Sequence, residues 1–147
     1  MEAREVRPSD AVEWFRLRDR AWPGEAEEKH AEQINGYLAN DDPSYKVFVA
    51  DAGDGKLAGM IEVSLRESGD GNIEKNWGKI EGLSTHPGVN FKEVVGLLLD
   101  TAVDWLRAHD PDVILSRCDS DDEALTEMFL EKGFAVDYRQ TYFRMEI

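Results

Sequence analysis

The residues best placed to hold a charged ligand lie where a predicted strand, residues 79–85, runs into a long predicted helix. The turn between strand and helix is His86-Pro87-Gly88. The helix carries apolar residues at helical spacing, namely Leu97, Leu98, Ala102, Trp105 and Leu106. Such a turn often holds an anion, because free N–H groups and the positive end of the helix dipole point at it. A phosphate-binding helix start is therefore the first hypothesis.

Charge indicates which partners suit the surface. The chain has 31 acidic and 17 basic residues, a formal net charge of −14. Phosphate backbones and anionic membranes repel such a surface, so we expect neither a nucleic-acid nor a membrane partner. A cationic small molecule would be attracted. The alternative is that acidity serves only solubility or adaptation to salt.

Length and composition predict one domain over residues 1–147. No apolar run approaches the roughly 18 residues of a membrane span, and the charged start of the chain lacks an apolar signal core. We therefore expect a cytoplasmic protein. The single cysteine, Cys118, excludes an intrachain disulfide, and the three histidines are too scattered to predict a metal site.

Hydrophobic periodicity predicts the order β-α-α-β-β-β-α-β-α-β. Strands are expected at residues 3–7, 45–50, 57–66, 79–85, 113–118 and 134–147. Ser9 or Asp10 would cap the first helix, with Glu13 at the reach-back position, and residues 26–38 would form the second. The last helix would begin near Asp119–Asp122 and end at Gly133. This order predicts a mixed sheet with helices on both faces.

Short motifs follow one another along nearly the whole chain. They are Val6 to Ala11 with Trp14, Leu17 and Arg18; Trp22-Pro23 followed by Glu27-Glu28-Lys29-His30; Gly59 to Arg66; Glu81-Gly82; and Gly133-Phe134 with Tyr142-Phe143-Arg144. With these motifs in this order, the chain resembles the GNAT superfamily of acyl-CoA-dependent N-acetyltransferases, most closely the aminoglycoside 6′-N-acetyltransferases. The resemblance implies an α/β GNAT fold, in which about four helices flank a mixed, mostly antiparallel sheet.

The resemblance also implies a reaction and its partners. A substrate amine would attack acetyl-CoA, the cosubstrate, directly and without a metal. The substrate would be a cationic aminosugar, as in aminoglycoside resistance, and a polyamine or peptide amine would also suit an acidic cleft. A homodimer is left open. The rival hypothesis is a GNAT-fold protein that binds a cationic ligand or a partner without efficient acetyl transfer.

The resemblance also implies which residues bind the substrate, from their positions in the family's pattern. Trp22 would form a wall of the cleft, and Asp70, Glu74 and Glu81 would hold the amines. Trp22 could instead be a core residue, and Asp70 and Glu74 could be solvated loop charges. Glu62, inside an apolar strand, is expected either to face outward or to lie in the cleft.

Asp119 is the candidate base or amine anchor. Gapless counting places Arg117 at the family's aspartate position, whereas a loop shortened by two residues places Asp119 there. We favour Asp119 because an arginine would repel a cationic substrate. Asp119, Asp121 and Asp122 could alternatively serve only to cap the following helix.

The cosubstrate site departs from the family pattern of a basic or amide residue followed by two small residues. The candidate residues are Leu83, whose N–H would polarise the thioester carbonyl, and Ser84, Thr85, Asn90, Phe91, Lys92, Glu93, Val94, Val95 and Phe129. Asn90 takes the amide position, while Glu93 and Val95 take the small ones. At about 5 Å and an effective dielectric near 20, Glu93 would oppose the pyrophosphate by about 3 kcal/mol, roughly a hundredfold in affinity.

The proton donor for the leaving thiolate is the second departure. The family places a tyrosine or a histidine four residues before the glycine that ends the last helix. Phe129 stands there and cannot donate a proton. Tyr138 or Tyr142 could substitute, although both also fit half-buried positions in the last predicted strand.

Overall fold

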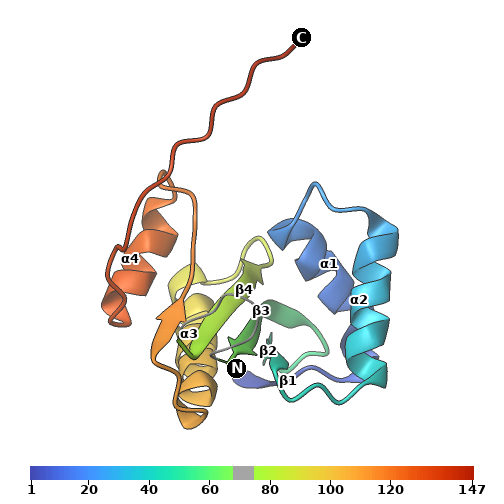
Figure 1. The fold of residues 1–147 in the computed structure, drawn as a ribbon. Coiled ribbons are helices and arrows are strands. Elements are labelled where there is room, and N and C mark those ends of the chain that lie inside the picture. Colours follow the sequence, from blue (N-terminus) through green and yellow to red (C-terminus); the bar gives the residue numbers. More distant parts are fainter. Residues whose placement is uncertain (68–74) are drawn as a thin grey trace. The chain divides into compact units, whose positions relative to one another are not determined.

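A computed structural model describes residues 1–67 and 75–147 of the chain (Figure 1). Its contacts divide the chain into two compact units, Met1–Arg117 and Cys118–Ile147, which we describe separately. None of the helices in the described residues is both long and apolar enough to cross a membrane.

The first unit contains the predicted elements in the predicted order. They are β1 Glu2–Glu5, a 3₁₀ turn Pro8–Asp10, α1 Ala11–Ala21, α2 Glu27–Ala39, β2 Tyr45–Asp51, β3 Leu57–Arg66, β4 Trp77–Thr85, α3 Phe91–Ala108 and β5 Val113–Leu115. The prediction of a mixed α/β fold is confirmed. The largest boundary error is β5, which ends at Leu115 rather than at residue 118.

The sheet has the strand order β1-β2-β3-β4-β5. Neighbours from β1 to β4 pair antiparallel, and β5 pairs parallel to β4. The sheet is therefore mixed and mostly antiparallel, as the resemblance implied.

Helices cover both faces of the sheet (Figure 1), and three glycines show how closely they pack. A Cβ added to Gly78 would lie 2.7 Å from Leu106 of α3, and one added to Gly59 would lie 2.9 Å from Val94 of the same helix. On the opposite face, a Cβ at Gly82 would overlap Trp22, the residue that follows α1. The middle of β3 is buried on both faces, which explains its nearly unbroken apolar sequence.

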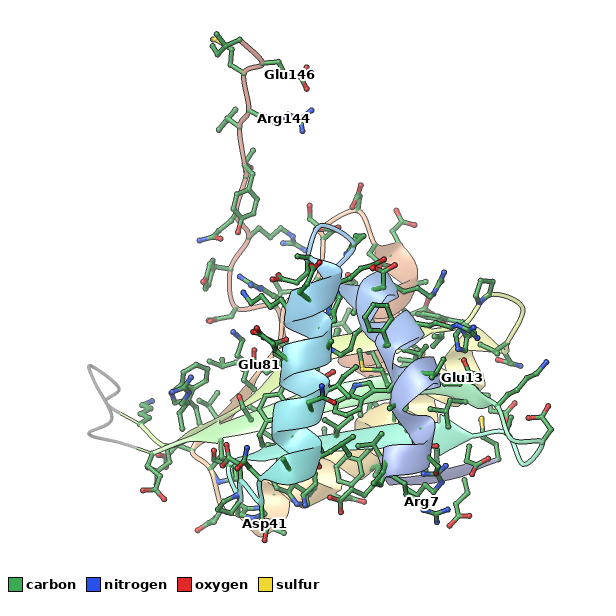
Figure 2. All side chains as sticks on the ribbon, turned by 90° about the vertical axis from the view of Figure 1, so that its right-hand side faces the viewer. Arg7, Glu13, Asp41, Glu81, Arg144 and Glu146 are labelled. Carbon is green, nitrogen blue, oxygen red and sulfur yellow. The ribbon has the colours of Figure 1, made fainter. Side chains whose placement is uncertain are left out.

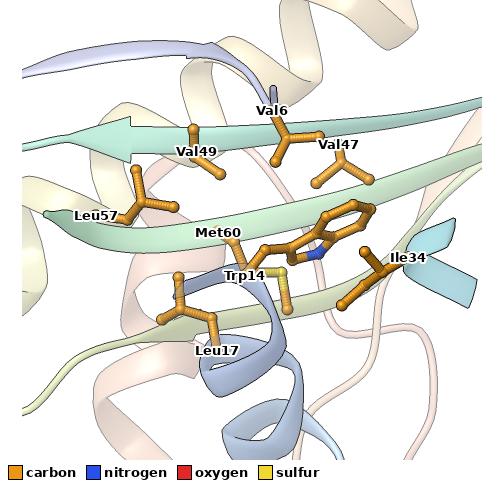
Figure 3. Close-up of a cluster of buried hydrophobic side chains, with 8 residues drawn as sticks. All are labelled: Val6, Trp14, Leu17, Ile34, Val47, Val49, Leu57 and Met60. Carbon is orange, nitrogen blue, oxygen red and sulfur yellow. The ribbon is translucent and has the colours of Figure 1, made fainter. Parts of the chain in front are cut away.

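The core on the α1 side is a cluster of large apolar side chains (Figure 3). Its members are Val6, Trp14, Leu17, Ile34, Val47, Val49, Leu57 and Met60. Burying each of the larger ones contributes roughly 1.5–3 kcal/mol. This cluster fixes α1 and α2 against the sheet and thereby fixes the residues that follow α1.

The start of α1 differs from the prediction. A 3₁₀ turn precedes the helix, and neither Ser9 nor Asp10 caps it through its side chain. The Asp10 carboxylate instead accepts hydrogen bonds from the Arg4 guanidinium (2.8 and 3.0 Å) and from the Arg7 N–H (2.7 Å). Arg4 also pairs with Asp51 at 3.0 Å. The predicted capping box is wrong because Asp10 is not the cap but the reach-back residue of the preceding turn, where its carboxylate also pairs with Arg4.

The second unit has the predicted helix caps. Helix α4 spans Glu123–Glu131, and the Asp122 carboxylate accepts from the Leu125 N–H at 3.1 Å. Beyond the helix, Gly133 has φ +94°, and the Phe134 N–H donates to the Phe129 carbonyl at 3.0 Å. The rings of Phe129 and Phe134 meet edge to face at 5.2 Å. This is a glycine-terminated Schellman motif with its hydrophobic contact.

The prediction of a strand over residues 134–147 is wrong. These residues form no strand in the structure, and Tyr138, Tyr142 and Phe143 are exposed rather than half-buried. Alternation of side chains permits a strand, but a strand exists only where its backbone pairs with another.

Asp10 is expected to contribute stability that depends on pH. The hydrogen bond from Arg4 holds the pKa of Asp10 below its usual value, against the opposing effect of burial. A lowered folded-state pKa means that this stabilisation is complete above the unfolded value of about 3.9 and is lost as pH falls through the folded-state pKa. Asp10→Asn should lower the free energy of unfolding by about 1–3 kcal/mol at pH 7.

Urea unfolding at pH 7 and near pH 3 tests this. The difference between wild type and Asp10→Asn should shrink at the lower pH, whereas Asp19→Asn, at an exposed position on α1, should change little at either. An Asp10→Asn deficit of equal size at both pH values would contradict the account.

Candidate active site

The site begins where β5 stops pairing with β4. Among the described residues, the two strands pair only over Trp77–Lys79 and Val113–Leu115. Residues 80–85, here called the edge segment of β4, continue without β5. This segment contains Leu83, Ser84 and Thr85, which sequence reasoning assigned to the cosubstrate.

A β-bulge shapes the edge segment. Glu62 of β3 lies opposite Gly82, whereas the next residue, Val63, lies opposite Ile80, so Glu81 is the extra residue. A bulge can turn two successive side-chain positions toward one face. Glu81 accepts a hydrogen bond from the Ser64 hydroxyl at 2.7 Å, and Gly82 meets Trp22. The Glu81-Gly82 pair therefore places a carboxylate beside a glycine that the indole covers.

Trp22 lies directly after the end of α1 and is half-buried. Its six-membered ring packs on Gly82, where any side chain would displace it. The Arg18 guanidinium carbon lies 4.7 Å from the Trp22 ring centroid. Trp22 thus packs partly against the core and is partly exposed, and its role as a cleft wall stays a prediction.

Glu81 keeps part of its carboxylate open to solvent. Its side chain is 29% exposed, and its second oxygen lies 3.6 Å from the Lys79 ammonium. That distance is long for a charge-assisted hydrogen bond. A substrate ammonium could therefore replace Lys79 beside Glu81.

Glu62 neither faces outward nor lies in an open cleft, so that prediction is wrong. Its side chain is 0% exposed, and it accepts hydrogen bonds from Arg18 (2.5 and 2.6 Å), Trp14 (3.0 Å) and Tyr45 (2.6 Å). Burial raises the pKa of Tyr45, and the negative charge of Glu62 raises it further. Sequence reasoning gave Arg18 no role. The available signal was a basic residue four positions after Trp14, on the apolar face of a helix.

The start of α3 is the candidate site for the pyrophosphate of CoA. Asn90 caps the helix by accepting from the Glu93 N–H at 3.1 Å, so the protein itself uses one donor that an anion would need. Val95 is 1% exposed and belongs to the core. Glu93 and Lys92 are exposed at the helix start. One backbone donor of the helix start is thus already used and a carboxylate is exposed beside it, and the phosphate site stays a prediction.

Two predicted site residues belong to the second unit and are described by themselves. Asp119 is exposed, and its carbonyl accepts from the Asp122 N–H at 3.0 Å in the turn before α4. Phe129 is buried against Phe134. Asp70 and Glu74 lie outside the described residues.

The first unit has a second acidic feature, a hollow that neither Glu81 nor Trp22 lines. A hollow of about 320 Å³ at the end of α2 is lined by Glu5, Asp41, Asp42 and neighbouring residues. Figure 2 shows Asp41, at this hollow, apart from Glu81. Among the described residues, no group of three or more His, Cys, Asp or Glu side chains is arranged to hold a metal ion.

Comparison with known proteins identifies the class. Residues 11–134 match the model of the GNAT acetyltransferase family. The match covers most of the chain, and the protein belongs to this family. No curated protein matches the sequence.

Solved structures agree on the fold. The aminoglycoside 6′-N-acetyltransferase AAC(6′)-Ig from Acinetobacter haemolyticus is 22% identical with a TM-score of 0.77, over 100% of this chain and 99% of that one. AAC(6′)-Iy bound to the bisubstrate analogue CoA-S-monomethyl-acetylneamine is 20% identical with a TM-score of 0.79, over 99% and 98%. A transcriptional regulator from Bacillus halodurans C-125 is 16% identical with a TM-score of 0.78, over 98% and 99%. At these identities the likeness establishes the fold alone.

Gly82→Ala should lower the free energy of unfolding by about 1–3 kcal/mol, because the added methyl group must displace the Trp22 ring. The matched control is Gly36→Ala in the interior of α2, where an added Cβ meets nothing within 4 Å. That change should raise stability by about 0.5–1 kcal/mol. Thermal and urea unfolding check both, and a Gly82→Ala protein as stable as wild type would show that the contact with Trp22 is not tight.

Proposed function

We propose that this protein is an acyl-CoA-dependent N-acetyltransferase that acts on an amino group of a cationic aminosugar. The observation that carries the proposal is the arrangement of Glu81 and Trp22 on one face of the β4 edge segment. A carboxylate beside an indole suits a sugar that bears ammonium groups, because the carboxylate pairs with an ammonium and the ring packs against the apolar face of the sugar.

Charge supports a cationic substrate. An ammonium about 4 Å from a carboxylate gains up to about 4 kcal/mol at an effective dielectric near 20, and solvent screening reduces this at a partly exposed site. Glu62 adds no net attraction at short range because Arg18 neutralises it. On this face of the described part of the sheet, the Glu81 carboxylate is therefore the one available to an ammonium. Asp119 is proposed as a further anchor or base.

The acyl donor would be held by the edge segment and the start of α3. Acyl-CoA, when bound, supplies its acyl group as a thioester. Leu83 to Thr85 and Asn90 to Glu93 are the residues proposed to hold it, with Lys92 partly offsetting Glu93. Val94 and Val95, which the sequence also suggested, are buried in the core and are left out of the proposal. Two structural neighbours are described as complexes with CoA or a CoA conjugate, which supports an acyl-CoA cosubstrate by analogy.

The second candidate function is binding of a cationic ligand without efficient transfer. Two observations favour it: Asn90 already caps the helix start, and Phe129 stands where the family has a proton donor. A third reading, transfer to a polyamine, differs only in the acceptor.

An acetyl-transfer assay separates these readings. Release of the CoA thiol is followed with acetyl-CoA and kanamycin, then with spermidine. Thiol release with kanamycin and an acetylated product by mass spectrometry are expected. Turnover with spermidine alone would overturn the aminosugar proposal, and kanamycin binding without turnover would favour the binding module.

Glu81→Gln should raise KM for kanamycin about tenfold or more while changing KM for acetyl-CoA little, since only the ammonium partner is lost. Glu28→Gln, at an exposed position on α2, is the charge-matched control and should leave both constants unchanged. Equal effects of the two changes would show that long-range charge, and not a local ion pair, attracts the substrate.

Glu93→Gln should tighten CoA binding by up to about a hundredfold, because it removes the carboxylate next to the proposed pyrophosphate position. Glu93→Gly should act in the same direction at some cost in helix stability. Calorimetric titration with CoA gives the affinities, and Asp104→Asn, an exposed change near the far end of α3, is the control. Unchanged affinity in both Glu93 variants would place the pyrophosphate elsewhere.

A further inference from the structure

We propose that Arg18 is a positioning residue for the substrate site: held in the core by Glu62, His30 and Gln33, it fixes the Trp22 ring beside Glu81. The claim that Arg18 affects substrate binding rests on the proposed function. The claim that Arg18 fixes the Trp22 ring concerns the free protein and does not.

The orientation of Trp22 must come from tertiary contacts. Helix α1 ends at Ala21, and Trp22 has φ −132° and ψ 72°, outside the helical region. Its ring contacts Gly82 on one strand, the Arg18 guanidinium at 4.7 Å and the His30 ring at 6.4 Å with a tilt of 36°. Because Gly82 has no side chain, it limits how closely the ring approaches but offers nothing to orient it. The ring also packs against the apolar core cluster, and Arg18 and His30 are the partners whose planar groups can set its orientation.

Arg18 is held on all three nitrogens. Nη1 donates to both Glu62 oxygens, Nε donates to His30 Nδ1 at 3.2 Å, and Nη2 donates to Gln33 Oε1. The residue is 5% exposed. A guanidinium is planar and stacks on aromatic faces, so fixing its plane also fixes the ring that lies on it.

His30 acts in this network as an acceptor. Its Nδ1 can accept from Arg18 only in the tautomer with the proton on Nε2. Nε2 is buried without a hydrogen-bond partner in the described part of the chain. The ring lies edge to face with Phe15 at 5.8 Å and near Trp22, so two aromatic side chains hold the imidazole that accepts from Arg18.

Stability alone does not account for this network. Desolvating a buried ion pair is costly, and apolar replacements of both partners are often neutral or stabilising. Trp14 and Tyr45 donate to Glu62 as well as Arg18, so three side chains are committed to one fully buried carboxylate. The arrangement does give a defined position to the Trp22 ring that lies on Gly82, the residue next to Glu81.

The test compares two ways of removing the network. Arg18→Lys keeps the charge but loses the planar group, and the double change Arg18→Met with Glu62→Met replaces the pair by apolar side chains that keep the core filled. Arg4→Met, which removes a different ion cluster with Asp10 and Asp51, is the matched control. Each protein is labelled with 5-fluorotryptophan, and the Trp22 resonance among the four tryptophans is assigned with Trp22→Phe.

We expect the Trp22 fluorine resonance to shift or broaden in both Arg18 variants and to stay in place in Arg4→Met. KM for kanamycin should rise about tenfold in the Arg18 variants with KM for acetyl-CoA unchanged, even where the double variant is as stable to urea as wild type. An unmoved Trp22 resonance in the folded Arg18 variants would overturn the proposal. A moved resonance with unchanged KM for kanamycin would overturn its link to substrate. Absence of any kanamycin turnover in wild type would instead refute the proposed function and leave the resonance result to stand.

Discussion

A β-strand presents neighbouring side chains to opposite faces, and the candidate site depends on one exception to that rule. The bulge at Glu81 turns this carboxylate toward α1 together with the next position, and a glycine at that position lets Trp22 lie on the strand. The same strand loses its pairing with β5 after Lys79. The bulge thus sets a carboxylate beside the glycine that the Trp22 ring covers, on a stretch of β4 that continues beyond its pairing with β5.

The charges of the site are arranged in two layers with different physical roles. Glu62 and Arg18 are buried and satisfy one another, so they act through geometry. Glu81 and Lys79 are partly exposed and loosely paired, so they can exchange partners with a ligand. The excess of acidic residues over the whole chain attracts cations in general. Only the partly exposed pair, Glu81 and Lys79, can distinguish one cation from another by direct contact.

Much of this could be predicted from sequence, because hydrophobic period and turn residues fix local structure. The helices and five of the six predicted strands follow from such signals, whereas the Glu81-Gly82 pair is singled out by the resemblance to the GNAT superfamily. The bulge depends on strand register and the Arg18–Glu62 pair joins residues far apart in the chain, neither of which periodicity encodes. The Arg4–Asp10 contact joins residues only six apart, but it depends on the turn between β1 and α1. The strand over residues 134–147 failed for the related reason that alternation does not supply a pairing partner. Val95 looked like an obstacle to CoA in the sequence, yet helix phase turns it into the core.

The measurement that tests the account most directly is a crystal structure of the protein with kanamycin and CoA. The account predicts that a sugar ring packs on Trp22 with an ammonium group within hydrogen-bonding distance of the Glu81 carboxylate. Kanamycin found only in the acidic hollow of Glu5, Asp41 and Asp42, with the Trp22 ring uncovered, would contradict it.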